Sequence, residues 1–162
     1  MRRLLTLCLI LGGPALAQPD PTQPSEGNQL RLTLGADGVQ IYRCAAEAAG
    51  PRWAFQGPEA LLFDAAGLQV GTHGAGPFWR LADGGLIRGT VAGQHPAPQA
   101  GAIPWLRLSV NSREGQGALT AMTEIRRIVT LGGVAPASGC DAASVGHEAR
   151  VRYSATYQFY SP

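Results

Sequence analysis

The sequence contains no lysine: all 13 of its basic residues are arginine, set against 11 acidic residues. The chain therefore lacks both a Schiff-base amine and the lysine of a phosphate-binding loop. Charged residues make up only 15% of the chain, and the formal net charge of +2 is too small for electrostatic binding of nucleic acid. The hydrophobic content of 45% is too high for disorder, and the length fits one domain.

The N-terminus has the pattern of a secretory signal peptide. Two arginines precede the apolar stretch 4–11, and Ala-Leu-Ala at 15–17 fits the small-x-small rule for a cleavage site. We predict a signal peptide over residues 1–17, cleaved before Gln18, and export to the periplasm or the extracellular space. Its removal leaves 11 arginines against 11 acidic residues. The mature chain is therefore neutral, and the net charge of +2 comes from the two arginines of the signal peptide. No membrane-spanning segment is expected after cleavage.

Cleavage also changes the cysteine count. Of the three cysteines, Cys8 lies in the signal, which leaves Cys44 and Cys140. An even pair in an exported chain favours one disulfide, although two free thiols or two metal ligands are the alternatives. The chain-entropy model gives roughly 4–5 kcal/mol for a bond that spans so much of the chain.

Short segments of alternating apolar and polar residues, separated by glycine-rich turns, fill the mature chain. Residues 18–28 form a polar, proline-rich lead that we expect to be a flexible or extended linker, followed by a single domain over 29–162. We expect a hairpin turn at Asp37-Gly38. The expected strands are 30–34, 39–44, 53–55, 60–63, 68–72, 78–81, 86–91, 106–110, 119–130 and 151–159.

The segment 119–130 is ambiguous, because Leu119, Met122, Ile125 and Val129 are spaced as on a helix while the segment is rich in β-branched residues. We predict a strand with a bulge at Arg126-Arg127. Nine or ten short strands with tight turns predict an all-β fold, an antiparallel β-sandwich or β-barrel. The absence of βα alternation argues against a doubly wound α/β fold.

The densest cluster of candidate site residues lies at 71–79, where His73 is followed by a Gly-Pro bend and Trp79. An imidazole beside an indole can offer a ligand one hydrogen bond and one stacking face. The alternative is that these residues only build the bend and the core. The sequence has no G-x-S-x-G, no G-x-G-x-x-G and no H-E-x-x-H, so we expect no catalytic triad, no cofactor and no metal.

Several ordered motifs resemble an exported bacterial and fungal family that is catalogued as a domain of unknown function. The resemblance covers about residues 30–160 and supports the disulfide, because both cysteines fall within the motifs. It implies no activity. The motifs are GVQIYRC at 38–44, PEA at 58–60, GTH at 71–73, GP with Trp79 at 76–79, IPWL at 103–106, GCD at 139–141 and YSATY with FY at 153–160.

Amphipathic side chains on predicted strands lead us to expect a module that binds a small molecule or a glycan. One alternative is a small hydrolase that uses His73 with Glu59 or Asp64. The other is a structural or stress-related envelope protein without a pocket. The ligand, the oligomeric state and the role of His73 stay open at this point. The expected binding residues are Gln40, Tyr42, His73, Trp79 and Trp105.

Overall fold

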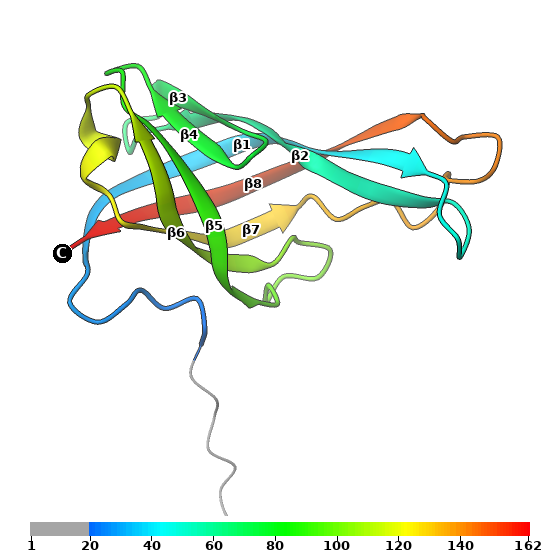
Figure 1. Ribbon diagram of the computed structural model, residues 1–162, viewed down its shortest axis with the longest axis horizontal. Coiled ribbons are helices and arrows are strands. Elements are labelled where there is room, and N and C mark those ends of the chain that lie inside the picture. Colours follow the sequence, from blue (N-terminus) through cyan, green and yellow to red (C-terminus); the bar gives the residue numbers. More distant parts are fainter. Residues whose placement is uncertain (1–19) are drawn as a thin grey trace, which may run out of the picture.

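A computed structural model describes residues 20–162 as an antiparallel β-barrel (Figure 1). Each strand pairs with the next along the chain, and the last strand pairs with the first, so the sheet closes. This confirms the all-β prediction and selects the barrel over the sandwich. The expected signal peptide, 1–17, lies outside the described residues. The elements are β1 (Gln29–Ala45), β2 (Arg52–Phe63), β3 (Gln69–Gly74), β4 (Phe78–Leu81), β5 (Leu86–His95), β6 (Trp105–Glu114), the 3₁₀ turn η1 (Ala118–Ala121), β7 (Glu124–Gly132) and β8 (Glu148–Ser161).

The barrel has eight strands rather than nine or ten, because two predicted pairs of strands are continuous. The hairpin predicted at Asp37-Gly38 is wrong: β1 runs straight through it, and Gly38 pairs with Ala60 on β2 and Tyr153 on β8. A Cβ on Gly38 would lie 2.2 Å from the Glu59 carbonyl oxygen. Glycine is needed there because β2 approaches closely, not because the chain turns.

The ambiguous segment 119–130 contains both kinds of structure. Its first residues form η1, in which Leu119 is fully buried, and the rest belongs to β7. The bulge predicted at Arg126-Arg127 is misplaced, since both residues keep regular pairing with β8. The irregularity falls between Ile128 and Leu131, where Val129 has a φ of 49°. The helical spacing and the β-branched content were therefore signals of two successive elements.

One end of the barrel interior is tightly filled. Leu34, Leu62, Ile87 and Phe159 are almost completely buried there, and Leu119 of η1 joins the same apolar cluster. Figure 1 shows η1 at the left-hand end, whereas β1, β2 and β8 extend past the other strands on the right. The alternation predicted for the last strand is confirmed, because every second side chain from Tyr153 to Phe159 is buried.

Residues 20–28, which belong to the segment predicted as a flexible or extended linker, contact the barrel through polar groups. Thr22 is fully buried, and Asp20 pairs with Arg126 at 3.0 Å. The carboxylate of Glu124 accepts hydrogen bonds from the Ser25 backbone and from Asn28, each at 2.8 Å. The N-terminal segment (residues 20–28) is thus fixed by polar contacts that hydropathy does not reveal.

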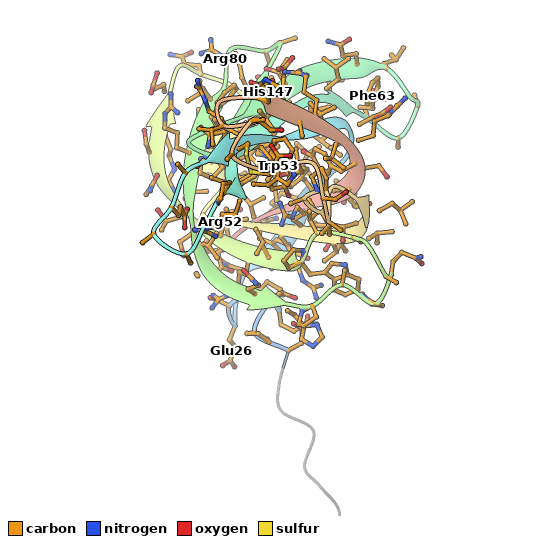
Figure 2. All side chains as sticks on the ribbon, turned by 90° about the vertical axis from the view of Figure 1, so that its right-hand side faces the viewer. Glu26, Arg52, Trp53, Phe63, Arg80 and His147 are labelled. Atoms are coloured by element: carbon orange, nitrogen blue, oxygen red, sulfur yellow. A yellow bond between two sulfur atoms is a disulfide. The ribbon has the colours of Figure 1, made fainter. Side chains whose placement is uncertain are left out.

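The predicted disulfide between Cys44 and Cys140 is confirmed. It joins the end of β1 to the loop between β7 and β8, and Trp53 donates a 3.0 Å hydrogen bond to the Ser138 carbonyl in the same loop. Figure 2 looks onto this end of the molecule and shows Trp53 near its middle. Within residues 20–162, no helix is long and apolar enough to cross a membrane.

Candidate functional site

The unfilled end of the barrel holds a cavity of about 200 Å³, which we name the mouth cavity. Every strand from β2 to β8 contributes to its lining, so it lies inside the ring of strands. Phe55 and Val91 are 55% and 50% exposed and mark its opening. The lining residues with apolar side chains are Phe55, Pro58, Pro77, Trp79, Val91, Leu106 and Leu108.

His73 and Trp79 meet in this cavity as a stacked pair. They are opposite each other in the β3–β4 ladder, and their ring centroids are 4.5 Å apart with an interplanar angle of 15°. Tyr157 of β8 packs edge-on against His73, with its ring centroid 4.9 Å away. The tight β3–β4 hairpin, which the Gly-Pro sequence predicted, is what brings the imidazole over the indole.

The His73 imidazole is neutral at physiological pH. It is only 3% exposed, and this burial lowers its pKa to about 4. Nδ1 lies 2.7 Å from the Phe78 carbonyl oxygen, which can only accept, so Nδ1 carries the proton. His73 thus presents Nε2 as an acceptor, held in one orientation by its own β-hairpin.

Two buried donors of the lining have no hydrogen-bond partner within residues 20–162. They are Nε1 of Trp79 and the hydroxyl of Tyr157, on side chains that are each 1% exposed. Buried polar atoms are nearly always paired in folded proteins, so each unpaired one calls for an explanation. Two residues that line the mouth cavity therefore carry buried hydrogen-bonding groups that residues 20–162 do not use.

Arg127 is the only charged side chain among the described lining residues. Its Nε and Nη2 both donate to the Pro104 carbonyl, at 3.1 and 2.8 Å, which fixes the guanidinium at the cavity wall. Burial raises the pKa of the Tyr157 phenol, and the charge of Arg127 opposes that rise. The cation and the phenol are therefore neighbours on one side of the cavity.

The other predicted binding residues lie elsewhere. Gln40 is buried in the barrel beside Gly133, and its Nε2 has no partner within residues 20–162. Tyr42 donates a 2.6 Å hydrogen bond to the Gly133 carbonyl, and its ring packs on Phe55 at 5.5 Å. Trp105 begins β6 and is not part of the lining. Of the five predicted residues, the structure brings only His73 and Trp79 together at the cavity.

Sequence reasoning missed Arg127 and Phe55 as lining residues. Alternation along the last strand placed Tyr157 on the inward face, but nothing distinguished it from other core aromatics. Arg127 lies on a strand whose boundaries were misjudged, so its inward direction could not be predicted. The inward position of Phe55 follows from the long pairing of β2 with β1, which residues far away in the sequence determine.

The carboxylates proposed for a hydrolase are not near the His73 imidazole. Glu59 bonds Arg150 at 2.7 Å on the outer face, and it neighbours Ala60, the ladder partner of His73, so it points the opposite way. Asp64 accepts hydrogen bonds from the backbone of Ala66 and Leu68 in its own turn. Among residues 20–162, no group of three or more His, Cys, Asp or Glu side chains is arranged to hold a metal ion.

A larger, shallow groove of about 900 Å³ runs along β1, β2, β3 and β8, and both Glu59 and His73 are among its lining residues. Its charged side chains already pair with one another, Glu59 with Arg150 and Asp37 with Arg152. Exposed pairs of this kind need no ligand to satisfy them. The mouth cavity, with unpaired buried donors and an apolar wall, is the better candidate site.

The model of a family described as "Protein of unknown function (DUF3455)" matches residues 24–161. The chain belongs to this family. The resemblance seen in the sequence motifs is thereby confirmed, and the match spans the whole barrel together with part of the N-terminal segment. The family description supplies no activity. Comparison with curated proteins and with solved structures finds no match.

Proposed function

We propose that this protein binds a small, largely apolar molecule in the mouth cavity. The observation that supports it is the combination of an apolar wall with unpaired buried donors, Trp79 Nε1 and the Tyr157 hydroxyl, inside a closed barrel. Ligand sites typically combine apolar walls with a few placed polar groups. An eight-stranded barrel is just wide enough to be filled by side chains or to hold one small ligand.

The cavity volume limits the size of the ligand. An apolar cavity of about 150 Å³ accommodates benzene. The mouth cavity, at about 200 Å³, therefore suits one ring with a short substituent. An oligosaccharide would not fit, and Trp79, the tryptophan at the cavity, is buried rather than displayed as a stacking platform. Of the two expected ligand classes, the geometry favours a small molecule over a glycan.

Binding is favoured over hydrolysis by the state of His73. A general base is commonly oriented by a third group, and here Nδ1 bonds a backbone carbonyl rather than Glu59 or Asp64. A pKa of about 4 also makes the imidazole a weak base near neutral pH. The existence of the cavity argues against an envelope protein without a pocket.

We further propose that binding takes place outside the cytoplasm. The signal-like pattern at 1–17 and the disulfide between Cys44 and Cys140 support this together, since disulfides persist in oxidising compartments. Mass spectrometry of the protein expressed with its full N-terminus would check it. A mature chain that begins at Gln18 is expected, and an uncleaved chain retained in the cytoplasm would contradict the proposal.

Tryptophan fluorescence and thermal-shift measurements with single-ring compounds test the binding proposal, because Trp79 forms part of the site. Val91→Trp adds bulk at the opening and should weaken binding of any ligand at least about tenfold, which corresponds to 1.4 kcal/mol. Leu68→Trp, at an exposed position outside the cavity, is the matched control and should bind as the wild type does. Binding that is unaffected by Val91→Trp, or no binding by any compound, would contradict the proposal.

A further inference from the structure

We infer that the ligand of the mouth cavity is a small monocarboxylic acid with an aromatic or compact apolar body, its carboxylate bound by Arg127. This inference rests on the proposed binding function and specifies its ligand class. It starts from an imbalance of charge. The cavity has one cation on its wall and no acidic side chain among its described lining residues.

Arg127 is a cation of the cavity wall without a carboxylate partner, whereas six of the eleven arginines within residues 20–162 have one. Within residues 20–162, no Asp or Glu oxygen lies within 4.0 Å of its guanidinium, which donates hydrogen bonds to the Pro104 carbonyl alone. Its neighbour Arg126, by contrast, pairs with Asp20. Arginines that do have a carboxylate partner are Arg52, Arg88, Arg107, Arg126, Arg150 and Arg152.

The charge of Arg127 acts on the interior of the barrel. It lowers the pKa of Tyr42 and of Tyr157, opposing in each case the larger effect of burial, and it adds to the lowering of the His73 pKa. All three groups are uncharged at neutral pH, so none of them balances the guanidinium. A partly buried cation at an apolar wall is best compensated by an anion that enters with the ligand.

The hydrogen-bonding groups of the wall match a carboxylate. Nη1 of Arg127 donates no hydrogen bond within residues 20–162, and the buried hydroxyl of Tyr157, whose polar neighbours are Arg127 and Tyr153, makes none of good geometry there. Both are donors, and a carboxylate is acceptor-only with about four lone-pair sites. Bonds between a guanidinium and a carboxylate are charge-assisted and roughly twice as strong as neutral ones.

The remaining walls determine the rest of the ligand. Phe55, Val91, Leu106 and Leu108 offer only hydrocarbon, so the body of the acid is apolar. The cavity has space for a single ring beside the carboxylate. Benzoate is therefore a suitable probe, and benzyl alcohol is a neutral analogue of nearly the same shape.

The test compares the affinities of benzoate, benzyl alcohol and toluene by tryptophan fluorescence and calorimetry. We expect benzoate to bind at least about tenfold more tightly than benzyl alcohol, since its carboxylate accepts charge-assisted hydrogen bonds from the guanidinium as an anion, whereas the alcohol is neutral. Arg127→Gln should abolish that preference while leaving toluene affinity within about threefold of the wild type. Arg80→Gln, on the outward-facing, exposed residue that follows Trp79, is the matched control and should retain the preference.

Arg127 also donates hydrogen bonds to the Pro104 carbonyl, so its replacement by Gln can destabilise the fold. Arg127→Lys is therefore a second variant, which separates the effect of charge from the effect on folding. Lysine keeps the positive charge, so a preference for benzoate should persist in this variant, and the cooperativity of thermal unfolding shows that each variant is folded. If benzyl alcohol binds as tightly as benzoate, or if Arg127→Gln retains the preference, the carboxylate inference is overturned while the binding function stands. If none of the three compounds binds, the proposed function itself fails.

Discussion

At the scale of single residues, His73 links the cavity to the pH dependence of stability. Its folded-state pKa of about 4 lies below the 6.5 of an unfolded histidine, so the folded protein binds fewer protons between these values. The stabilisation is complete above pH 6.5 and is lost as the pH falls towards 4. The free energy of unfolding should therefore drop by about 2 kcal/mol between pH 7 and pH 5.

Urea unfolding at several pH values measures this loss, and His73→Phe, which keeps an aromatic ring against Trp79, should flatten the profile between pH 7 and pH 5. His95→Phe, at an exposed position, is the control and should keep the wild-type slope. A wild-type profile that is already flat over this range would show that His73 is not held neutral by burial.

The strained backbone of Val129 has a measurable effect on the stability of the protein. Its φ of 49° is costly for a β-branched side chain, about 1–3 kcal/mol, and the side chain is 59% exposed, so it contributes little packing. Val129→Gly removes the strain at an entropic cost of roughly 0.5–1 kcal/mol. We expect the variant to be more stable by about 1 kcal/mol in urea unfolding. Val134→Gly, at an exposed position without positive φ, should instead be neutral or destabilised.

His73 and Trp79, two of the candidate site residues, are neighbours as the sequence predicted, and they lie in one short hairpin. Local turn chemistry was enough to place them, because the contact spans only a few residues. Arg127 and Phe55 come from strands that reach the cavity through pairing with distant parts of the chain. Their direction depends on register, and a shift of one residue would have moved each to the outer face.

At the scale of elements, contacts between distant segments also explain why the sequence predicts nine or ten strands and the barrel has eight. Gly38 follows Asp37, and Asp-Gly is a strong hairpin signal. Here, however, glycine is required because the backbone of β2 packs too closely against it for a side chain to fit. A glycine required by a turn and one required by a neighbouring strand look alike until the partner is known. Alternation alone, by contrast, was sufficient to predict the final strand and the all-β class.

The N-terminal segment is an element whose attachment depends on Glu124. Burial raises the pKa of this carboxyl, but hydrogen bonds from Ser25 and Asn28 and the Arg107 guanidinium outweigh it and hold the pKa near 2. Glu124→Gln removes the charge at nearly constant size. It should cost about 2–3 kcal/mol in the free energy of unfolding and speed hydrogen exchange at the Ser25 amide, which bonds the carboxylate.

Glu114→Gln is the matched control for this element, because Glu114 is exposed and its nearest cation, Arg88, is 4.0 Å away. Its stability and exchange should match the wild type. The contribution of Glu124 is complete above pH 4.5 and is lost as the pH falls towards 2. Unchanged exchange at Ser25 in Glu124→Gln would show that the segment is held by its other contacts alone.

At the scale of the whole molecule, the bond between Cys44 and Cys140 is the one covalent constraint within the described residues beyond the backbone itself. It spans a separation of 96 residues, so cross-linking restricts the unfolded chain strongly. The barrel itself closes through the pairing of β1 with β8, which needs no cysteine. The disulfide should therefore determine how stable the barrel is, rather than whether it forms.

The double variant Cys44→Ala/Cys140→Ala tests this separation of roles, with alanine chosen because Cys44 is fully buried. Its free energy of unfolding should fall by up to about 4–5 kcal/mol, with a single cooperative transition and an unchanged far-ultraviolet dichroism spectrum. Neither cysteine lines the mouth cavity, so the folded variant should bind ligand as the wild type does. Reduced wild-type protein is the control and should unfold at the same urea concentration. A variant that loses its β-spectrum in buffer would show that strand pairing alone cannot close the barrel.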